Sequence, residues 1–214
     1  MTAVFDLEGT LTAGETWKGL ARYLRAHGRR AEYDRFFALH LPGALLAKAG
    51  LLPRRWYQNV WMRNLAGLLR GLDEAALREV AEGVVEEELW PKRKERVVAR
   101  LFDHLDRGHR VVLASGTYEP VLRAFAQRLA PEVEALGTPL ELREGRATGR
   151  LAGPVHVGRR KAERVRAYLG GAPDYAYGDT LADLPLLLLA AHPVAVDPDP
   201  RLRREARRRG FEIL

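Results

Sequence analysis

The chain has 214 residues, which is enough for one α/β domain that carries an inserted subdomain. Hydrophobic residues make up 47% of it and charged residues 29%, proportions typical of a globular rather than a disordered protein. The absence of cysteine excludes disulfides, thiolate metal sites and a thiol nucleophile.

The formal net charge of +7 fits either a polyanionic partner or a basic surface that attracts phosphorylated ligands, and we favour the second. The longest apolar run, residues 184–191, contains Pro185 and is too short to span a bilayer. The first apolar run begins at Ala3 and leaves no room for a signal peptide, so we expect a cytoplasmic protein with no membrane partner. Abundant arginine, with little serine, asparagine or glutamine, indicates a GC-rich or thermophilic source.

The first half of the chain predicts one strand followed by helices. Residues 3–7 form a short apolar run that predicts a buried strand. From about residue 16 to 107, apolar side chains recur at helical spacing. Four or so consecutive helices cannot lie inside a parallel sheet. We therefore expect a helical cap over residues 15–91, inserted into a core formed by residues 1–14 and 92–214.

After residue 107, strands and helices alternate. The expected elements are strand 110–114, helix 120–129, strand 133–136, a hairpin of 140–142 and 147–151, helix 159–168, strand 175–179, helix 183–191, strand 193–196 and a basic helix 201–209. Buried strands joined by helices predict an α/β fold with a doubly wound parallel sheet. Ligands bind such sheets at the carboxyl ends of the strands, where we expect Asp6, Ser115 and Asp179.

Carboxylates gather at these expected strand ends. Asp6 and Glu8 would point to opposite faces of a continuing strand, but a turn at Gly9 lets both approach one centre. Asp179 and Asp183 are spaced as a turn that leads into a helix. A carboxylate cluster without cysteine or histidine is a hard-oxygen site, which fits Mg²⁺ rather than zinc.

Two further groups are candidates for binding phosphate. Ser115-Gly116-Thr117 offers a hydroxyl and backbone N–H groups at a helix N-terminus, and Lys161 offers a compact positive charge. Ser115 could instead be the N-cap of the next helix, or serve both roles. Lys161 follows Arg159 and Arg160, so it could instead belong to a solvated helix face.

Together these groups fit phosphoryl transfer. A carboxylate attacks a dianionic phosphate poorly unless charge is neutralised, which Mg²⁺ and Lys161 would do. Attack by Asp6 would form an aspartyl-phosphate and divide one difficult displacement into two easier ones. Glu8 could protonate the leaving alkoxide and then deprotonate the hydrolytic water.

Four segments resemble the motifs of the haloacid dehalogenase superfamily, in the same order. They are residues 6–12 (Asp-Leu-Glu-Gly-Thr-Leu-Thr), 115–117 (Ser-Gly-Thr), Lys161 and 178–185 (Gly-Asp-Thr-Leu-Ala-Asp-Leu-Pro). The resemblance covers nearly the whole chain. Further segments, 137–138, 148–151 and 193–202, are similar to subfamily IB, which includes phosphoserine phosphatase and places a helical cap between the first two motifs.

The resemblance implies a role for each group. Asp6 is the nucleophile and a metal ligand, and Glu8 is the acid/base and lends its backbone carbonyl to Mg²⁺. Asp179 is a direct metal ligand. Asp183 binds the metal through water or supports Lys161, although it could also be a plain helix N-terminal residue. Ser115, Gly116 and Lys161 hold the phosphoryl oxygens. Most of the family has Asp where this chain has Glu8.

We expect residues of the cap to select the substrate. Glu15 lies nine residues after Asp6, where phosphoserine phosphatases carry a glutamate that binds the substrate amino group, but it could equally begin the first cap helix. Arg63 is a candidate carboxylate binder, as are Arg54 and Arg55, and no motif selects among them. Three aromatic residues at helical spacing predict the cap core instead of a substrate cage: Phe36, Trp56 and Trp61.

These features favour a Mg²⁺-dependent hydrolase of small phosphomonoesters, with phosphoserine the leading candidate. Transfer of the phosphoryl group to an alcohol passes through the same intermediate and stays open. Dehalogenation would leave the metal-binding carboxylates unexplained. A nucleic-acid-binding protein is the alternative from another class, because residues 201–209 are strongly basic, but its carboxylate cluster would repel a phosphate backbone.

Overall fold

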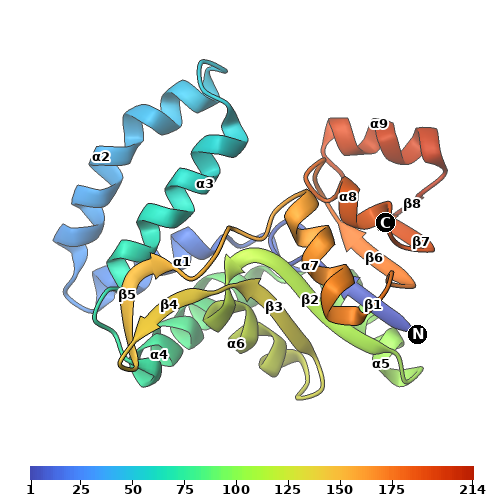
Figure 1. Ribbon diagram of the computed structural model, residues 1–214, viewed down its shortest axis with the longest axis horizontal. Helices are drawn as coiled ribbons and strands as arrows, with labels where there is room; N and C mark the ends of the chain where they lie inside the picture. Colours follow the sequence, from blue (N-terminus) through green and yellow to red (C-terminus); the bar gives the residue numbers. More distant parts are fainter.

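The structure is a computed structural model that describes residues 1–214, apart from the side chains of residues 54 and 55. Its centre is a six-stranded sheet in which every neighbouring pair is parallel, in the order β3-β2-β1-β6-β7-β8 (Figure 1). The strands are β1 (Thr2–Phe5), β2 (Arg110–Tyr118), β3 (Glu134–Thr138), β6 (Tyr175–Gly178), β7 (His192–Ala195) and β8 (Glu212–Ile213).

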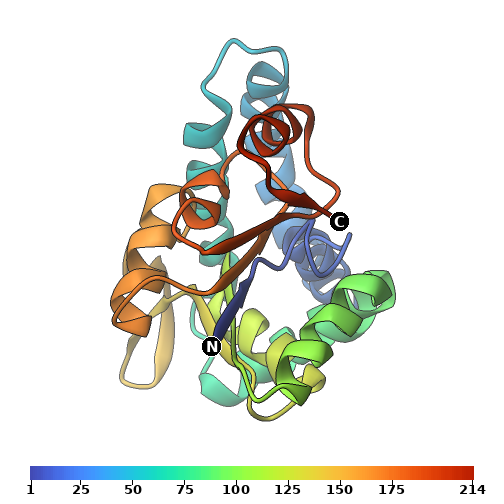
Figure 2. The same cartoon turned by 90° about the vertical axis from the view of Figure 1, so that its right-hand side faces the viewer.

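Helices cover both faces of this sheet (Figure 2). On one face Phe5 packs in a core cluster with α5 (Glu95–Asp106) and α6 (Glu119–Leu129). On the other face Val4 packs with residues of α7 (Arg159–Leu169), α8 (Leu184–Leu187) and α9 (Pro200–Arg209). Complete burial of such an apolar side chain stabilises the fold by roughly 1.5–3 kcal/mol. The predicted doubly wound parallel sheet is confirmed.

The strand order fixes where a ligand binds. From β1 the chain builds towards β2 and β3 on one side, and β6, β7 and β8 lie on the other. The switch point of such a sheet, where a crevice opens at the carboxyl ends of the strands, therefore lies between β1 and β6.

Between β1 and α5 the chain is helical from Thr16 to Lys92, as expected for an inserted cap (Figure 1). Its long helices α2 and α3 form a hairpin that extends away from the sheet (Figures 1 and 2). Its elements are α1 (Thr16–Ala26), α2 (Arg30–Lys48), α3 (Arg54–Leu65), the 3₁₀ helix η1 (Ala66–Leu69), α4 (Glu74–Val84), the π-helical turn η2 (Val85–Leu89) and the 3₁₀ turn η3 (Trp90–Lys92).

The prediction for the cap aromatics holds only in part. Phe36 is buried, and its ring centroid lies 5.1 Å from that of the half-buried Trp61. Trp56 is 56% exposed, so the prediction that it joins the cap core is wrong. It lies near the start of α3, away from the end at which that helix meets η1.

A β-hairpin, β4 (Leu140–Arg143) and β5 (Arg146–Leu151), joins the core to the cap at a second place. The amide of Gly71 donates to the carbonyl of Ala147 at 2.8 Å, and the amide of Ala147 donates to the carbonyl of Leu72 at 2.8 Å. The chain segments that enter and leave the cap also bond to each other, since Ala13 N–H donates to Lys92 O at 2.9 Å. The cap is thus tied to the core through the hairpin as well as near the segments that connect the two.

Three elements differ clearly from the prediction. β2 runs to Tyr118, beyond the predicted end at residue 114, because it stays paired with β3 after a register shift. β8 is a further strand that the sequence pattern did not predict. The helix predicted over 183–191 is shorter, because α8 ends at Leu187 and His192 N–H already donates to Asp174 O beside β6 at 2.7 Å.

None of the described helices combines the length and the apolar character that crossing a bilayer requires.

Candidate active site

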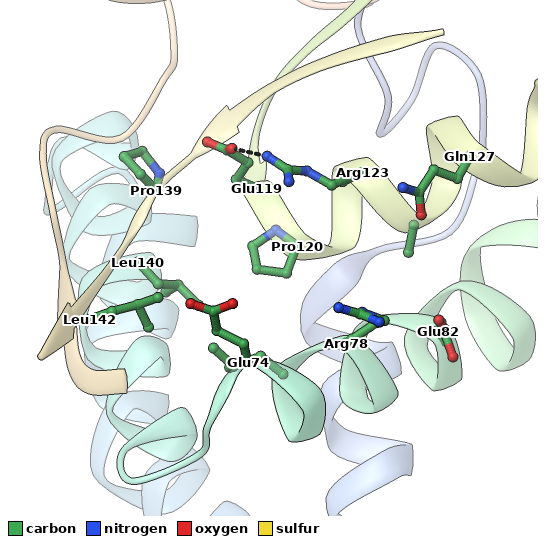
Figure 3. Close-up of a pocket in the computed structure, with 12 residues that line it drawn as sticks. Glu74, Arg78, Glu82, Glu119, Pro120, Arg123, Gln127, Pro139, Leu140 and Leu142 are labelled. Atoms are coloured by element: carbon green, nitrogen blue, oxygen red, sulfur yellow. Dashed lines mark hydrogen bonds and ion pairs between the residues drawn. The ribbon is translucent and has the colours of Figure 1, made fainter. Parts of the chain in front are cut away.

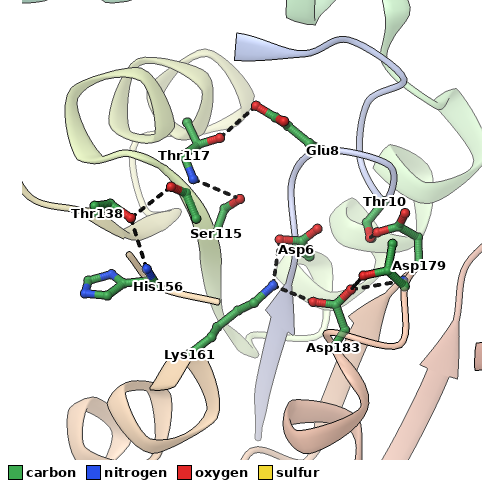
Figure 4. A network of polar contacts seen from close by, with 12 residues as sticks. Asp6, Glu8, Thr10, Ser115, Thr117, Thr138, His156, Lys161, Asp179 and Asp183 are labelled. Atoms are coloured by element: carbon green, nitrogen blue, oxygen red, sulfur yellow. Dashed lines mark hydrogen bonds and ion pairs between the residues drawn. The ribbon is translucent and has the colours of Figure 1, made fainter. Parts of the chain in front are cut away.

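Asp6 stands directly after β1, at the switch point of the sheet. Its amide donates to the carbonyl of Tyr177 at 3.0 Å, so the sheet itself fixes the backbone there. The side chain is buried, and Oδ1 accepts a hydrogen bond from Nζ of Lys161 at 2.8 Å (Figure 4). Burial raises the pKa of Asp6 to about 6, although Lys161 opposes the shift.

Lys161 projects from α7 into the site. Its ammonium group is buried between Asp6 and Asp183, with Nζ 2.5 Å from Oδ1 of Asp183. The alternative that Lys161 belongs to a solvated helix face is therefore wrong, and that description fits the exposed Arg159 and Arg160. Burial alone would lower the pKa of Lys161, but the charges of Asp183 and Asp6 outweigh it and raise the pKa.

Asp183 is equally enclosed, next to the start of α8. Its Oδ2 accepts bonds from the amide of Thr180 at 3.1 Å and from the hydroxyl of Thr180 at 3.0 Å. Asp183 occupies the N-cap position of α8, so its place at a helix N-terminus is confirmed. Its carboxylate makes no capping bond to that helix and bonds to Lys161 and Thr180 instead. Burial would raise the pKa of Asp183, but Lys161 outweighs it and lowers the pKa.

Asp179 follows β6 and completes a group of three carboxylates. Asp6, Asp179 and Asp183 each offer an oxygen, and these atoms lie within 4.8 Å of one another. Burial, reinforced by the charges of Asp6 and Asp183, raises the pKa of Asp179 to about 8. Three carboxylates face one ammonium group, which leaves an excess of negative charge among oxygen donors, so this group could hold a divalent metal ion.

Gly9 allows the turn after β1 to pass beside Asp179. Its φ of +88° lies in the region that favours glycine, and a Cβ atom there would stand 2.1 Å from Oδ2 of Asp179. The hydroxyl of Thr10, the next residue, donates to Oδ1 of Asp179 at 3.2 Å. The turn therefore packs directly on a predicted metal ligand.

The side chain of Glu8 is not one of the three converging carboxylates. Its Oε1 accepts from the hydroxyl of Thr117 at 2.9 Å (Figure 4) and from the amide of Thr16 at 2.8 Å. Burial raises the pKa of Glu8 despite these bonds, which favours a carboxyl group that can carry a proton. Its role as acid/base and its backbone contact with a metal stay predictions.

Ser115 and Gly116 lie on the last part of β2 rather than in a loop at a helix N-terminus, which corrects that part of the prediction. The N-cap position of α6 belongs to Tyr118, so the N-cap alternative for Ser115 is wrong. The Ser115 side chain is buried, and its Oγ accepts a long bond of 3.4 Å from the amide of Thr117. The carbonyl of Gly116 accepts from the hydroxyl of Thr138 at 2.8 Å.

The predicted specificity residues lie at the surface. Glu15 occupies the N-cap position of α1 without a side-chain capping bond; its carboxylate pairs with Lys18 at 2.8 Å and is 41% exposed. Arg63 is exposed on α3. The side chains of Arg54 and Arg55 lie outside the described part of the structure.

Several site residues were missed by the sequence reasoning. The hydroxyl groups of Thr10, Thr117 and Thr180 donate to carboxylates of the site, and Thr16 donates its amide to Glu8. Asp199 was also missed, and its Oδ2 accepts from the amide of Leu181 at 3.1 Å. Three of these threonines lie inside the motif segments, but threonine is common in turns and carries no distinctive chemical signal.

A surface pocket of about 730 Å³ lies apart from these residues, between α4, α6 and β4 (Figure 3). Its lining mixes both charges with apolar side chains, including the ion pair of Glu119 and Arg123 at 2.7 Å. The described lining includes none of the predicted catalytic or metal-binding residues.

Comparison with known proteins places this site in a family. Residues 3–188 match the haloacid dehalogenase-like hydrolases. The chain is 32% identical over 222 residues to phosphoserine phosphatase SerB1 of Mycobacterium tuberculosis, covering 99% of this chain and 69% of that protein. It is 27% identical to a histidinol-phosphatase of Neisseria meningitidis, covering 99% and 97%.

Solved structures share the fold. A Bordetella pertussis protein of unknown function aligns with a TM-score of 0.83 at 27% identity, covering 100% of this chain and 97% of the other. A phospho-aspartyl intermediate analogue of phosphoserine phosphatase aligns with a TM-score of 0.61 at 20% identity, covering 99% and 91%. The chain belongs to the haloacid dehalogenase-like hydrolases. Within that family it is similar to proteins named phosphoserine phosphatase and probable phosphatase.

Proposed function

We propose that the protein is a Mg²⁺-dependent phosphomonoester hydrolase that acts on a small phosphorylated metabolite through an aspartyl-phosphate at Asp6. The observation that carries the proposal is the buried group of Asp6, Lys161, Asp179 and Asp183 at the switch point of the sheet. Lys161 bridges two of the three carboxylates, so the site combines a nucleophile with a fixed positive charge.

The side-chain atoms that could bind a metal here are all carboxylate oxygens, a donor set that fits Mg²⁺. Asp6, Asp179 and the backbone carbonyl of Glu8 would hold the ion, with Asp183 binding through water or supporting Lys161. When bound, the ion neutralises charge on the transferring phosphoryl group.

In the first half-reaction a carboxylate oxygen of Asp6 attacks phosphorus. The new O–P bond forms as the bond to the leaving oxygen breaks, and Glu8 supplies the proton that makes the product an alcohol. Lys161 and the hydroxyl of Ser115 hold the phosphoryl oxygens, as do the N–H groups around Gly116. Because Nζ of Lys161 lies at Oδ1 of Asp6, Oδ2 is the oxygen with fewer protein contacts and the better placed to attack.

In the second half-reaction water attacks the phosphorus of the aspartyl-phosphate. Glu8, now ionised, takes a proton from this water, the acyl O–P bond breaks and the Asp6 carboxylate is restored. Inorganic phosphate is released. An alcohol in place of water would give phosphotransfer, which keeps that reaction as the alternative.

Phosphoserine is the leading substrate candidate because a relative named phosphoserine phosphatase aligns with 99% of this chain. Histidinol phosphate is the second candidate, because the relative named histidinol-phosphatase aligns over nearly its whole length. Both molecules carry an amino group, which an acidic residue such as Glu15 could bind. Only phosphoserine carries a carboxylate, for which Arg63 is a candidate partner.

We also propose that the cap comprises residues 15–91 and the core residues 1–14 and 92–214. The hydrogen bond between Ala13 and Lys92 supports these boundaries, because it joins the entering and leaving segments at one place. A basic nucleic-acid-binding function is less favoured, since Glu205 pairs with both Arg208 and Arg209 on α9.

The experiment is phosphate release from phosphoserine, histidinol phosphate and p-nitrophenyl phosphate, with Mg²⁺ and with EDTA. Turnover that requires Mg²⁺ supports the proposed chemistry, and the ratio of kcat/KM between the two amino-group substrates chooses between them. A folded protein that releases phosphate from none of a broad panel of phosphomonoesters would overturn the proposed hydrolysis.

A further inference from the structure

The carboxyl group of Glu8 is bonded by residues from two other parts of the chain. Glu8 lies in the turn after β1, Thr117 lies on β2, and Thr16 is the first residue of α1 in the cap. Both threonines are buried. Their donors converge on the same oxygen, Oε1 of Glu8, at 2.9 Å from the Thr117 hydroxyl and 2.8 Å from the Thr16 amide.

The direction of these bonds can be assigned by counting protons. A threonine hydroxyl has one proton, and that of Thr117 is donated to Glu8. The two threonine hydroxyls also lie 3.2 Å apart, so in their mutual bond Thr16 is the donor and Thr117 the acceptor. The result is a chain of hydrogen bonds from the Thr16 hydroxyl through the Thr117 hydroxyl to Oε1.

Two donors occupy the lone pairs of Oε1, so a proton carried by this carboxyl group sits on Oε2. The same contacts limit rotation of the side chain, which has one more methylene than the aspartate usual at this position. The extra length is therefore matched by two contacts that hold one end of the carboxyl group.

We propose that Thr117 is a positioning residue that orients Glu8 as the proton donor to the leaving group. This inference rests on the proposed phosphatase function. As the ester bond breaks, the proton on Oε2 moves to the leaving oxygen, and the negative charge that develops on Glu8 is stabilised by the two donors at Oε1. In the second half-reaction Oε2 takes a proton from the attacking water.

The test uses two substrates whose leaving groups need different help. An alkyl alkoxide, as from phosphoserine, is a poor leaving group that depends on protonation, whereas p-nitrophenolate leaves without it. kcat/KM is the relevant constant, because it reports on steps up to formation of the aspartyl-phosphate. We expect Thr117→Val to lower kcat/KM on the order of 10- to 100-fold for the fastest alkyl ester and less than about threefold for p-nitrophenyl phosphate.

Two further variants separate positioning from folding. Thr117→Ser keeps the hydroxyl and should restore the alkyl ester to within about threefold of wild type. Thr148→Val removes a hydroxyl that donates to Glu141 at 2.6 Å on the β4–β5 hairpin, and should leave both substrates unchanged.

Equal losses on both substrates for Thr117→Val, no loss on either, or a Ser variant as slow as the Val variant would each overturn the positioning role while leaving the phosphatase function in place. A folded wild-type protein that is inactive on every phosphomonoester would overturn the function and this inference together.

Discussion

At the scale of single residues, Asp6 has the most demanding role. Its carboxylate is buried against Lys161, and no other described side chain of the site is placed directly at the end of β1. We predict that Asp6→Asn reduces kcat by at least about 10³-fold, because an amide cannot form the acyl phosphate. Phosphate release measures the loss, and circular dichroism checks that the fold survives. Activity near wild type, free of deamidated protein, would remove the nucleophile assignment.

Glu8 gives a second prediction. Glu8→Gln keeps the size of the side chain but cannot exchange a proton, so we expect phosphate release from an alkyl ester to slow by roughly 10²–10⁴-fold. Steady-state kinetics with Mg²⁺ measures it. A loss well under tenfold would show that water or another group moves the proton.

The charged residues of the site could be predicted from the sequence, whereas the threonine side chains that bond to them could not. Asp6 and Asp179 come together with Lys161 and Asp183 because the first two follow β1 and β6, and the other two lie at the starts of α7 and α8, at the same edge of the sheet. The hydroxyl donors are different, because a threonine has no sequence signal until its neighbour in space is known. Thr16 contacts Thr117 across 101 positions of sequence, which local patterns cannot reveal.

At the scale of elements, the turn after β1 gives a third prediction. Gly9→Ala would place a Cβ 2.1 Å from Oδ2 of Asp179 and would strain a backbone with φ of +88°. We expect a loss of stability of about 1 kcal/mol or more and a large loss of activity. Urea unfolding and phosphate release measure the two effects.

Gly28→Ala is the matched control for that variant. Gly28 has a φ of +73°, but nothing lies within 4 Å of the position of its Cβ. It should therefore show a similar loss of stability with activity retained. Equal activities for the two variants would contradict the close packing of Gly9 on Asp179.

Element boundaries were less predictable than element types. β2 extends beyond its apolar residues because β3 continues to pair with it. β8 has only two residues, which are too few to show a periodicity. The leucine-rich run after Asp183 predicted one long helix. α8 nevertheless ends at Leu187, and β7 begins at His192, whose amide donates to the carbonyl of Asp174. In each case pairing with a distant strand overrides the local pattern.

At the scale of the whole molecule, two buried histidines connect stability to pH. Burial, with His109 and Arg107 nearby, lowers the pKa of His104 to about 4, and burial with Arg164 lowers that of His156 to about 4. Nδ1 of His104 lies 2.8 Å from Nδ1 of His109, and its Nε2 lies 2.8 Å from the hydroxyl oxygen of Tyr177.

Both histidines have lower pKa values in the folded protein than the ordinary value of 6.5, so the unfolded chain binds more protons below that pH. Their contribution to stability is complete above pH 6.5 and is lost as the pH falls towards 4. We predict that the free energy of unfolding decreases across this window, and less steeply in His104→Gln. Urea midpoints over the pH range measure it; identical slopes would contradict the effect.

The overall architecture was the most predictable level. Alternating strands and helices after residue 107 predicted the parallel sheet. A run of helices with no strand between them, from about residue 16 to 107, predicted the cap. The tie between the β4–β5 hairpin and the cap at Gly71 and Leu72 could not be predicted, because it joins backbone groups and leaves no residue pattern. A cytoplasmic location and a thermophilic source stay predictions.

The central claim is that the phosphoryl group passes through Asp6. The most direct measurement is rapid acid quenching of Glu8→Gln mixed with ³²P-labelled p-nitrophenyl phosphate and Mg²⁺. Its leaving group needs no proton from Glu8, whereas loss of the base still slows the second half-reaction. We predict a hydroxylamine-labile label on the peptide that contains Asp6. The label should be absent with EDTA and absent from the double variant that carries both Asp6→Asn and Glu8→Gln. Phosphate release without any labelled protein, or a label that persists in the double variant, would contradict the claim.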